Sequence, residues 1–589
     1  MNKIFLIIVI FLINTAFSLS LINDTKNDDE IMNALRDEIS RSLKKLKLES
    51  IRAPYYIEYS LRLRKVYNVK SDYGLLTESN NMSYALLNVG VRVGDYKFDN
   101  TNFFDVGLSF FGSSDDEENF RNRQIPIELD YSTLRRELWL ATDAAYKQAA
   151  ELYSKKEAIL KSLMRRDTIP DFLETAPTKN KIIKNIPPFE TKKFEDLAKK
   201  LSHSFRNYPD IINATVGMEY LPEKVYYVNS EGTEYITTDY YTGLEIVAFT
   251  QSNDGMPLAN FYTALGKSPN DLPSADSLMK AAKSVADVLS KMTKSVPLDE
   301  PYAGPVVFSD AAAGELIGQA FAPNFVTQRA PLAEGGTAFN DRFGAFQNKI
   351  GGRVLPEFLS VTADPISEQM YNTKFIGSFE LDGDGLKPSK VNLVENGYLK
   401  NLLSERIPTR RVKQSNAHKR GGSAMLSNII FTSDKEHSVS SDSLINRMME
   451  LCKARELPYG IVVTKLLNQN ILFTTLFRIA YGAYQPATGT NVITIVEAYK
   501  VFPDGKREII RGGELSGVNV QSFKDVLLMG NSNYVHNFLS PAVISPFITG
   551  GDQYLGVSIV SGNLLFEDVE IRNSERDYKK PPILDSPLK

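Results

Sequence analysis

The most informative stretch of this 589-residue chain reads Ser309-Asp-Ala-Ala-Ala-Gly-Glu-Leu-Ile-Gly-Gln-Ala-Phe-Ala-Pro-Asn-Phe325. A short apolar run, 305–308, comes directly before it and predicts a buried strand. The stretch itself predicts a helix that ends near Ala322, because Pro323 has no backbone N–H and clashes with the preceding turn. The sequence therefore predicts a strand that runs directly into a helix.

Further short motifs follow one another along residues 220–570. They are 225–233 (VYYVNSEGT), 394–400 (VENGYLK), 403–406 (LSER), 418–422 (HKRGG) leading to 427–428, and 485–489 (QPATG) before 496–499 and 504–505. Each motif alone is an ordinary turn signal. Their order and spacing, together with 305–321, resemble the TldD/PmbA family of metallopeptidase-like proteins, and residues 50–165 resemble its N-terminal domain more loosely.

The resemblance implies an α+β protein. Its N-terminal region would be α/β with a long helix, and its C-terminal domain would be dominated by antiparallel β-sheet. The resemblance also implies dimers that enclose a cavity for an unfolded peptide, which would bind as an added strand through backbone hydrogen bonds. Both a homodimer and a heteromer with a family relative remain open.

Active family members resemble one another in a HExxxH zinc motif on the helix and a later cysteine ligand. The corresponding hexad here, 318–323, reads GQAFAP and contains neither histidine nor glutamate. Zinc hydrolysis needs three protein ligands and a carboxylate that takes the proton of the metal-bound water. We therefore predict that Gly318, Gln319 and Pro323 form a degenerate motif with no catalytic residue, no metal and no cofactor.

An intact HExxxH motif requires that its two histidines point to the same side of the helix. Positions five residues apart lie about 140° apart around a regular α-helix, so the helix must be distorted or wider at the hexad. Glu315, one turn before Gln319, is predicted to be an ordinary solvated helix residue rather than a substitute base.

The chain has four histidines, and no two are close in sequence: His203, His418, His437 and His536. His418 lies in the basic segment 410–420, which favours a solvated loop, with a mobile peptide-contacting loop as the alternative. A metal role for His536 would need ligands from distant segments. The single cysteine, Cys452, lies in a helical pattern and is predicted to be buried. The candidates for a peptide-binding cavity are Gln319, His418, Arg420 and Asn428.

The N-terminus predicts a signal peptide. Lys3 precedes an apolar run, 4–12, and Ala16-Phe17-Ser18 is a plausible cleavage site. The apolar run is shorter than the ~20 residues that span a membrane. We expect an exported protein, periplasmic or secreted, with no transmembrane segment in the mature chain. Its formal net charge of −3, from 68 basic and 71 acidic residues, argues against a nucleic-acid partner.

The predicted domains are a signal peptide (1–20), an N-terminal α/β domain with a linker (21–190), a central α/β domain (191–300), a β-rich domain (301–573) and a loose tail (574–589). The longest helical pattern spans 131–166, where apolar residues recur mostly at threes and fours. The segment 229–233 predicts a hairpin turn, because Gly232 permits positive φ. The segment 382–385 (DGDG) also predicts a hairpin turn, since the other ligands of an EF-hand loop are missing.

Three functions remain open at this stage. The first is an exported, catalytically inactive protein that binds unfolded peptide or a family partner subunit. The second is an active metallopeptidase with an unconventional site. The third is a structural envelope protein that reuses the fold, because a fold does not determine a function.

Overall fold

The structure of the chain is a computed structural model. The structure describes residues 27–573 except 48–51, 106–119, 163–168, 299, 334–335, 338–342, 468–491, 545–548, 550 and 553, and it also describes 582, 584 and 587. The predicted signal peptide (1–20), the motif at 485–489 and most of the predicted tail lie outside the described residues.

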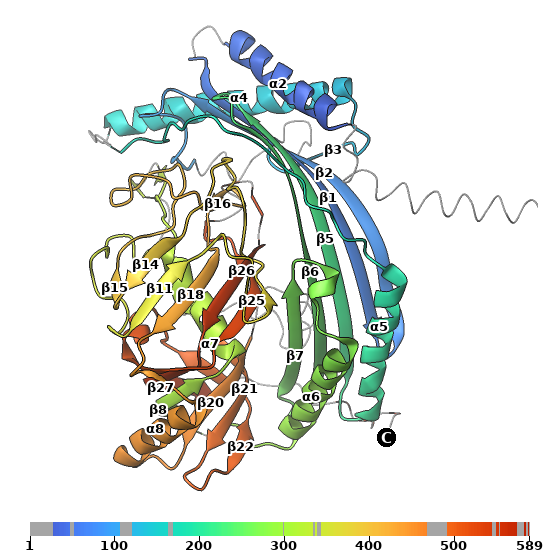
Figure 1. Ribbon diagram of the computed structural model, residues 1–589, viewed down its shortest axis with the longest axis vertical. Helices are drawn as coiled ribbons and strands as arrows, with labels where there is room; N and C mark the ends of the chain where they lie inside the picture. The colour runs from blue at the N-terminus through green and yellow to red at the C-terminus, as the bar shows by residue number, and fades with distance from the viewer. Residues whose placement is uncertain are drawn as a thin grey trace, which may run out of the picture.

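A sheet of long, curved strands forms one side of the molecule and bends around the C-terminal region (Figure 1). Its order is β3-β2-β1-β5-β6-β4, with β7 also paired to β6. The strands are β1 (Pro54–Asp72), β2 (Leu75–Val93), β3 (Arg123–Ile125), β4 (Lys179–Ile182), β5 (Asn213–Asn229), β6 (Glu234–Gln251) and β7 (Pro257–Gly266). At ~3.3 Å per residue, β1 is on the order of 60 Å long. The sheet crosses the domain boundary predicted at residue 190.

Helices cover one face of this long sheet. They are α2 (Asp28–Lys45), α4 (Tyr131–Ser162), α5 (Thr191–His203) and α6 (Ala275–Thr293). On β1, Ile57, Tyr59 and Leu61 are fully buried and belong to the same hydrophobic cluster as residues of α2 and α4. The predicted long helix is confirmed as α4, up to the point where residues 163–168 leave the described part of the chain.

The turn between β5 and β6 follows the prediction from sequence. The two strands pair antiparallel from Asn213 to Val228, and Gly232 has a φ of +96°. A positive φ is accessible to glycine without the steric cost that a Cβ atom imposes. The predicted hairpin at 229–233 is therefore confirmed.

The C-terminal region contains two large sheets, of orders β15-β14-β11-β18-β26-β25 and β19-β24-β27-β23-β21-β20-β8, with β22 paired to β21. Most pairings are antiparallel, which confirms the expected α+β class with a sheet-rich C-terminal region. The strands are β8 (Tyr302–Phe308), β11 (Leu359–Ala363), β14 (Val391–Glu395), β15 (Tyr398–Leu399), β18 (Asn428–Ser433), β19 (Ser438–Val439), β20 (Gly460–Leu466), β21 (Ile493–Val501), β22 (Arg507–Ile510), β23 (Gly513–Ser516), β24 (Val526–Gly530), β25 (Tyr534–Pro541), β26 (Tyr554–Ser561) and β27 (Leu564–Asn573).

Smaller elements connect these sheets. Three two-stranded hairpins are formed by β9 (Leu332–Ala333) with β10 (Gly336–Thr337), β12 (Gln369–Met370) with β13 (Thr373–Lys374), and β16 (Lys419–Arg420) with β17 (Ser423–Ala424). Helix α8 (Ser441–Ala454) contains the predicted buried Cys452, which is fully buried. In the described part of the chain, no helix is long and apolar enough to cross a membrane.

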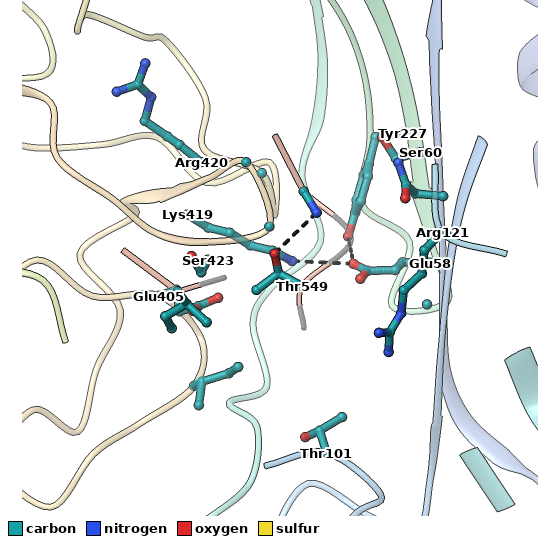
Figure 2. A pocket seen from close by; sticks show the side chains of 18 of the residues that line it. Glu58, Ser60, Thr101, Arg121, Tyr227, Glu405, Lys419, Arg420, Ser423 and Thr549 are labelled. Carbon is teal, nitrogen blue, oxygen red and sulfur yellow. Dashed lines mark hydrogen bonds and ion pairs between the residues drawn. The ribbon is translucent and has the colours of Figure 1, made fainter. Parts of the chain in front are cut away.

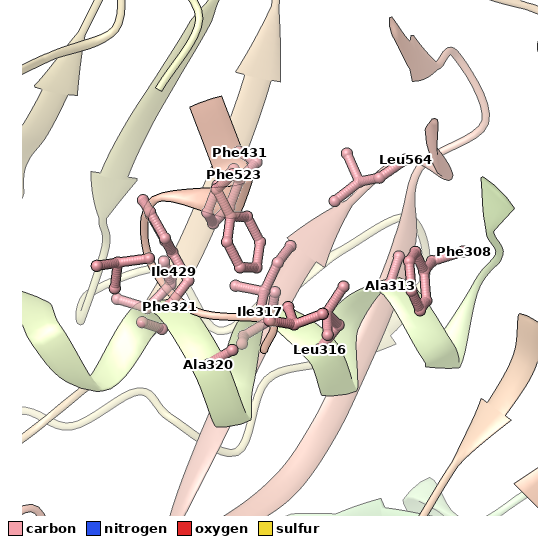
Figure 3. Packing of buried hydrophobic residues seen from close by; sticks show 14 of the residues in the cluster. Phe308, Ala313, Leu316, Ile317, Ala320, Phe321, Ile429, Phe431, Phe523 and Leu564 are labelled. Carbon is pink, nitrogen blue, oxygen red and sulfur yellow. The ribbon is translucent and has the colours of Figure 1, made fainter. Parts of the chain in front are cut away.

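The predicted strand-to-helix stretch lies between the two C-terminal sheets (Figures 1 and 3). After β8 the chain forms α7 (Ala311–Leu316), then a π-helix over Ile317–Phe321 and a 3₁₀ turn over Ala322–Phe325. The widened helix expected at the hexad is therefore present. Phe321 is fully buried, and its ring centroid lies 5.3 Å from that of Phe346 and 4.5 Å from that of Phe523.

Candidate functional site

A cavity of about 520 Å³ lies between the uncovered face of the long sheet and loops of the C-terminal region, and it extends to α4, where Ala145 and Ala149 line it. A second cavity of about 470 Å³ continues along the same face. The two adjoin, because both are lined by Glu223, Asp239, Arg420, Asp552 and Leu555. Together they form a hollow that follows the strands of the sheet.

On the sheet side, the wall of this hollow is formed by side chains that alternate between the two faces of each strand. On β1, Glu58, Ser60 and Arg62 line the first cavity, while the residues between them are buried under the helices. Successive side chains of a strand point to opposite faces, so one strand supplies both the core and a polar wall. The wall is held in place by ion pairs such as Arg62 to Asp552, with 2.5 Å between Nη1 and Oδ2.

The opposite wall comes from the β16–β17 hairpin (Figure 2). Lys419 extends from it toward Glu58 of the sheet, with 3.8 Å between Nζ and Oε2. The same Nζ lies 2.7 Å from Oδ1 of Asp384. Tyr227 of β5 donates its hydroxyl to Glu58 at 2.8 Å. A lysine of one region and a glutamate of the other therefore face each other across the cavity.

Lys419 is surrounded by four carboxyl groups, which we call the acidic cluster: Glu58, Asp382, Asp384 and Glu405. Asp382, Asp384 and Glu405 are at most 5% exposed. Burial, and then the charge of Asp384, raise the pKa of Asp382 to about 8. Burial raises the pKa of Glu405 to about 7, although Lys419 opposes the shift.

The two ends of the Lys419–Glu58 contact are shifted toward their charged forms. Burial opposes the charge of Glu58, but Lys419 and the Tyr227 hydroxyl outweigh it and lower its pKa. Burial likewise opposes the charge of Lys419, yet Asp384 and Glu58 raise its pKa well above the usual value. The site therefore holds a fixed positive charge inside a group of carboxyls.

Of the four residues predicted from sequence for a peptide cavity, Arg420 lines both cavities. Its Nη1 donates to the carbonyls of Leu426 and Gly556 at 2.6 and 2.9 Å. Burial lowers the pKa of Arg420 to about 10. Gln319, His418 and Asn428 line neither cavity.

The predicted solvated loop is wrong for His418 itself, although Arg410, Arg411 and Lys413 of the same segment are exposed. His418 is fully buried, its Nδ1 lies 2.9 Å from the carbonyl of Asn416, and its ring packs edge-on against Phe379. Burial lowers its pKa to about 4, so the ring is neutral near pH 7. Asn428 is also fully buried, and its side-chain amide donates to the carbonyls of Asp364 and Ser367. Both side chains hold loops in place.

The prediction of a solvated Glu315 is also wrong. Glu315 is 3% exposed, and its Oε2 lies 2.7 Å from Nε2 of His536 on β25. Its Oε1 accepts a hydrogen bond from Gln319 Nε2 at 2.7 Å. Gln319 also donates to the carbonyl of Leu467. Glu315 and His536 are buried and Gln319 is half-buried, and together they fix the helix against β25 and the residue that follows β20.

The residues at the hexad do not fit the zinc ion that the family resemblance implies. Gly318 offers no donor atom, and a Cβ placed there would lie 2.6 Å from Cζ of Phe538. A histidine at this position would therefore require Phe538 to move. Pro323 is buried and has no donor side chain. In the ranges that the structure describes, no three His, Cys, Asp or Glu side chains are grouped closely enough to hold a metal ion.

Sequence reasoning did not find the acidic cluster. The DGDG segment forms the predicted turn, in which Gly385 N–H donates to the Asp382 carbonyl. It joins no strand pair, however, and its carboxyls point into the protein. One available signal was the polar alternation on β1, where Glu58, Arg62 and Arg64 alternate with apolar residues.

Comparison with known proteins agrees with this architecture. Residues 301–572 match the family described as the PmbA/TldA metallopeptidase C-terminal domain. The fold is similar to a "putative modulator of a DNA gyrase" from Thermotoga maritima, with a TM-score of 0.55, 13% identity, and coverage of 91% of this chain and 99% of the other. It is also similar to TldE from Thermococcus kodakarensis, with a TM-score of 0.54, 13% identity, and coverage of 92% and 100%. No curated protein sequence matches the chain.

Proposed function

We propose that this chain, whose residues 301–572 match the PmbA/TldA metallopeptidase C-terminal domain, is an exported TldD/PmbA-family member that binds an extended peptide without hydrolysing it. The peptide would lie in the hollow between the long sheet and the C-terminal region. The partner in the assembly would be a second copy of the chain or a family relative.

The shape and lining of the hollow carry this proposal. Its two adjoining parts, of about 520 and 470 Å³, follow β1, β5 and β6 in the strand direction. Volumes of roughly 300–1,000 Å³ are typical of ligand sites. The walls present both donors, such as Arg420 and Lys419, and acceptors, such as Glu58 and Asp239. A peptide backbone needs both kinds of group wherever it is removed from water.

The absence of hydrolysis is proposed from side-chain chemistry. Gln319 stands where the resemblance places a general base, and an amide cannot take a proton near neutral pH. Its amide is already engaged with Glu315 and Leu467. The buried Glu315–His536 pair supplies two groups of the right type for a peptidase, but neither residue lines the hollow.

Binding can be tested with fluorescent, unfolded peptides by anisotropy. Ser60→Trp places a bulky ring on the cavity wall, and Ser83→Trp places the same ring on β2 outside both cavities. We expect the unmodified protein and Ser83→Trp to bind the peptides alike, and Ser60→Trp to bind at least about tenfold more weakly, a loss of ~1.4 kcal/mol. Equal binding by both variants would contradict the proposed site. Failure of every peptide to bind would favour a structural role.

Hydrolysis and export are tested separately. Incubating the same peptides with the protein, with and without added zinc, should leave them intact by mass spectrometry. Cleavage that a chelator abolishes would show an active peptidase instead.

For export, the mature N-terminus should begin after the segment 16–18 when the full chain is expressed with its own leader. Retention of Met1 in the cell fraction would oppose this part of the proposal.

A further inference from the structure

The acidic cluster contains more carboxyl groups than the chain provides cations to balance. Lys419 is the one ammonium group among Glu58, Asp382, Asp384 and Glu405 in the described part of the cavity. Two nearby arginines pair with other carboxylates: Arg92 with Asp99 at 2.9 Å, and Arg406 with Glu231 at 2.6 Å. Their charges act on the cluster at longer range, Arg92 on Glu58 and Glu405, and Arg406 on Asp384. In the described part of the chain, Lys419 is therefore the one cation that forms ion pairs with these carboxyls.

Two oxygens of the cluster lack a hydrogen-bond partner. Oδ1 of Asp382 accepts the backbone N–H groups of Asp384 and Leu386, both at 2.9 Å. Oδ1 of Asp384 faces Lys419. Among the described residues, no donor reaches Oδ2 of Asp382 or of Asp384, although both atoms are buried. Asp382 is 2% exposed and lines the cavity. A buried acceptor without a partner is costly, so a donor brought by a ligand would stabilise it.

The protonation behaviour of the cluster agrees with a missing cation. Burial raises the pKa of Asp382 to about 8 and that of Glu405 to about 7. In both cases burial disfavours the charged form more than Lys419, the backbone hydrogen bonds and, for Glu405, Arg92 together favour it. A second positive charge in the cavity would favour both carboxylates and bring these pKa values down.

The geometry of the free oxygens distinguishes between kinds of cation. A guanidinium group binds best to both oxygens of one carboxylate through two parallel hydrogen bonds. On Asp382 and Asp384, one oxygen of each pair is already occupied by backbone or by Lys419. An ammonium group is a compact charge with three rotatable donors and can address single oxygens of different carboxylates.

We infer that the acidic cluster binds a primary ammonium group of the bound peptide, either its N-terminal amine or a lysine side chain. This inference rests on the proposed function. It makes the hollow selective: one point along the bound peptide must carry an ammonium, while the polar walls elsewhere accept ordinary backbone.

The first test uses one flexible peptide in four forms. It carries a free N-terminus and one lysine, and the other forms have the N-terminus acetylated, the lysine replaced by norleucine, or both. We expect removal of the responsible ammonium to weaken binding at least about tenfold, as for loss of one member of a buried charge pair. The form that loses affinity identifies the source. Equal affinity of all four forms would overturn the inference and leave peptide binding intact.

The variant Asp382→Asn should bind all four forms with nearly equal, weak affinity. The matched control is Asp276→Asn, an exposed aspartate at the start of α6 that lines neither cavity. It should retain the preference of the unmodified protein. A preference for the ammonium that persists in Asp382→Asn would contradict the assignment.

A second measurement uses the Tm shift caused by small ammonium salts, so it does not require that a peptide binds. Millimolar n-butylammonium should raise the Tm of the unmodified protein more than tetramethylammonium, which has the same charge but no N–H donor, because a ligand stabilises the state that binds it. Asp382→Asn should lose this difference. If the difference is present and no peptide binds, the proposed function fails while the ammonium site stands. Equal shifts by both salts in the unmodified protein would refute the site.

Discussion

Replacing Glu315 with alanine tests most directly whether the hexad region is a structural unit. A solvated helix glutamate can be replaced at a cost within about 0.5 kcal/mol. Glu315 is instead buried and accepts hydrogen bonds from His536 and Gln319, both at 2.7 Å. Each hydrogen bond to a charged group contributes about 1.5–3 kcal/mol, and Glu315 accepts one from each of these two side chains. We therefore expect Glu315→Ala to destabilise the protein by about 3–5 kcal/mol.

The loss is measured by urea unfolding followed by two probes. Far-UV circular dichroism reports the whole chain, whereas the single tryptophan, Trp139, lies on α4 and reports the N-terminal part. With a slope of about 3 kcal/mol per molar urea, the predicted loss moves the C-terminal transition down by at least ~1 M. If the N-terminal part unfolds separately, its fluorescence midpoint stays in place.

Two further variants control this experiment. Glu450→Ala removes an exposed glutamate of α8 that pairs with Arg447 at 2.8 Å, and its cost should stay below about 1 kcal/mol. In a double-mutant cycle, Glu315→Ala and His536→Ala should couple by more than ~1 kcal/mol, because each removes the other's partner. A cost for Glu315→Ala as small as that of Glu450→Ala, with no coupling, would refute the reasoning.

Three other outcomes follow from the same region and its surroundings. Phe321→Ala should cost about 3–5 kcal/mol in urea unfolding, because the ring is fully buried among other aromatic side chains of the π-helix core. Gly314→Ala should destabilise by about 1–3 kcal/mol despite the better helix propensity of alanine, since its Cβ would lie 2.4 Å from Cβ of His536; an unchanged Tm would contradict this close packing. The pKa of His418 is lowered to about 4, so the stability it contributes is complete above about pH 6.5 and is lost as the pH falls toward 4. The Tm difference between the unmodified protein and His418→Gln should shrink over that interval, and a constant difference would count against a neutral, buried ring.

Local sequence patterns predicted a helix, strand or turn well where its formation depends on residues that are close in the chain. The alternation on β1, the apolar stripe of α4 and the positive φ at Gly232 depend on neighbouring residues and on intrinsic backbone preferences. The end of the α- and π-helical part at Phe321, next to the predicted Ala322, is of the same kind, although a 3₁₀ turn continues across Pro323. Each of these features is confirmed, because a period of two or of three to four residues is visible without knowing the partner surface.

The surroundings of single polar residues could not be predicted in the same way. Glutamate is a residue type that is mostly exposed in proteins, and His418 lies in a basic segment, yet both side chains are buried. The hydrogen bond of Glu315 reaches a residue 221 positions away. Burial of a polar side chain depends on whether a distant segment supplies its partner, and no local pattern reports that.

The amino-acid sequence was sufficient to predict the α+β class, the resemblance to the TldD/PmbA family, the strand-to-helix stretch and the absence of donor side chains at Gly318 and Pro323. The place where a ligand could lie depends on contacts between segments that are distant in the chain. The tertiary structure brings the polar face of β1 against the β16–β17 hairpin and places Lys419 among carboxyls from separate loops. The physical reason is that backbone preferences act over a few residues, whereas a cavity and its charge balance arise from segments that meet only when the chain is folded.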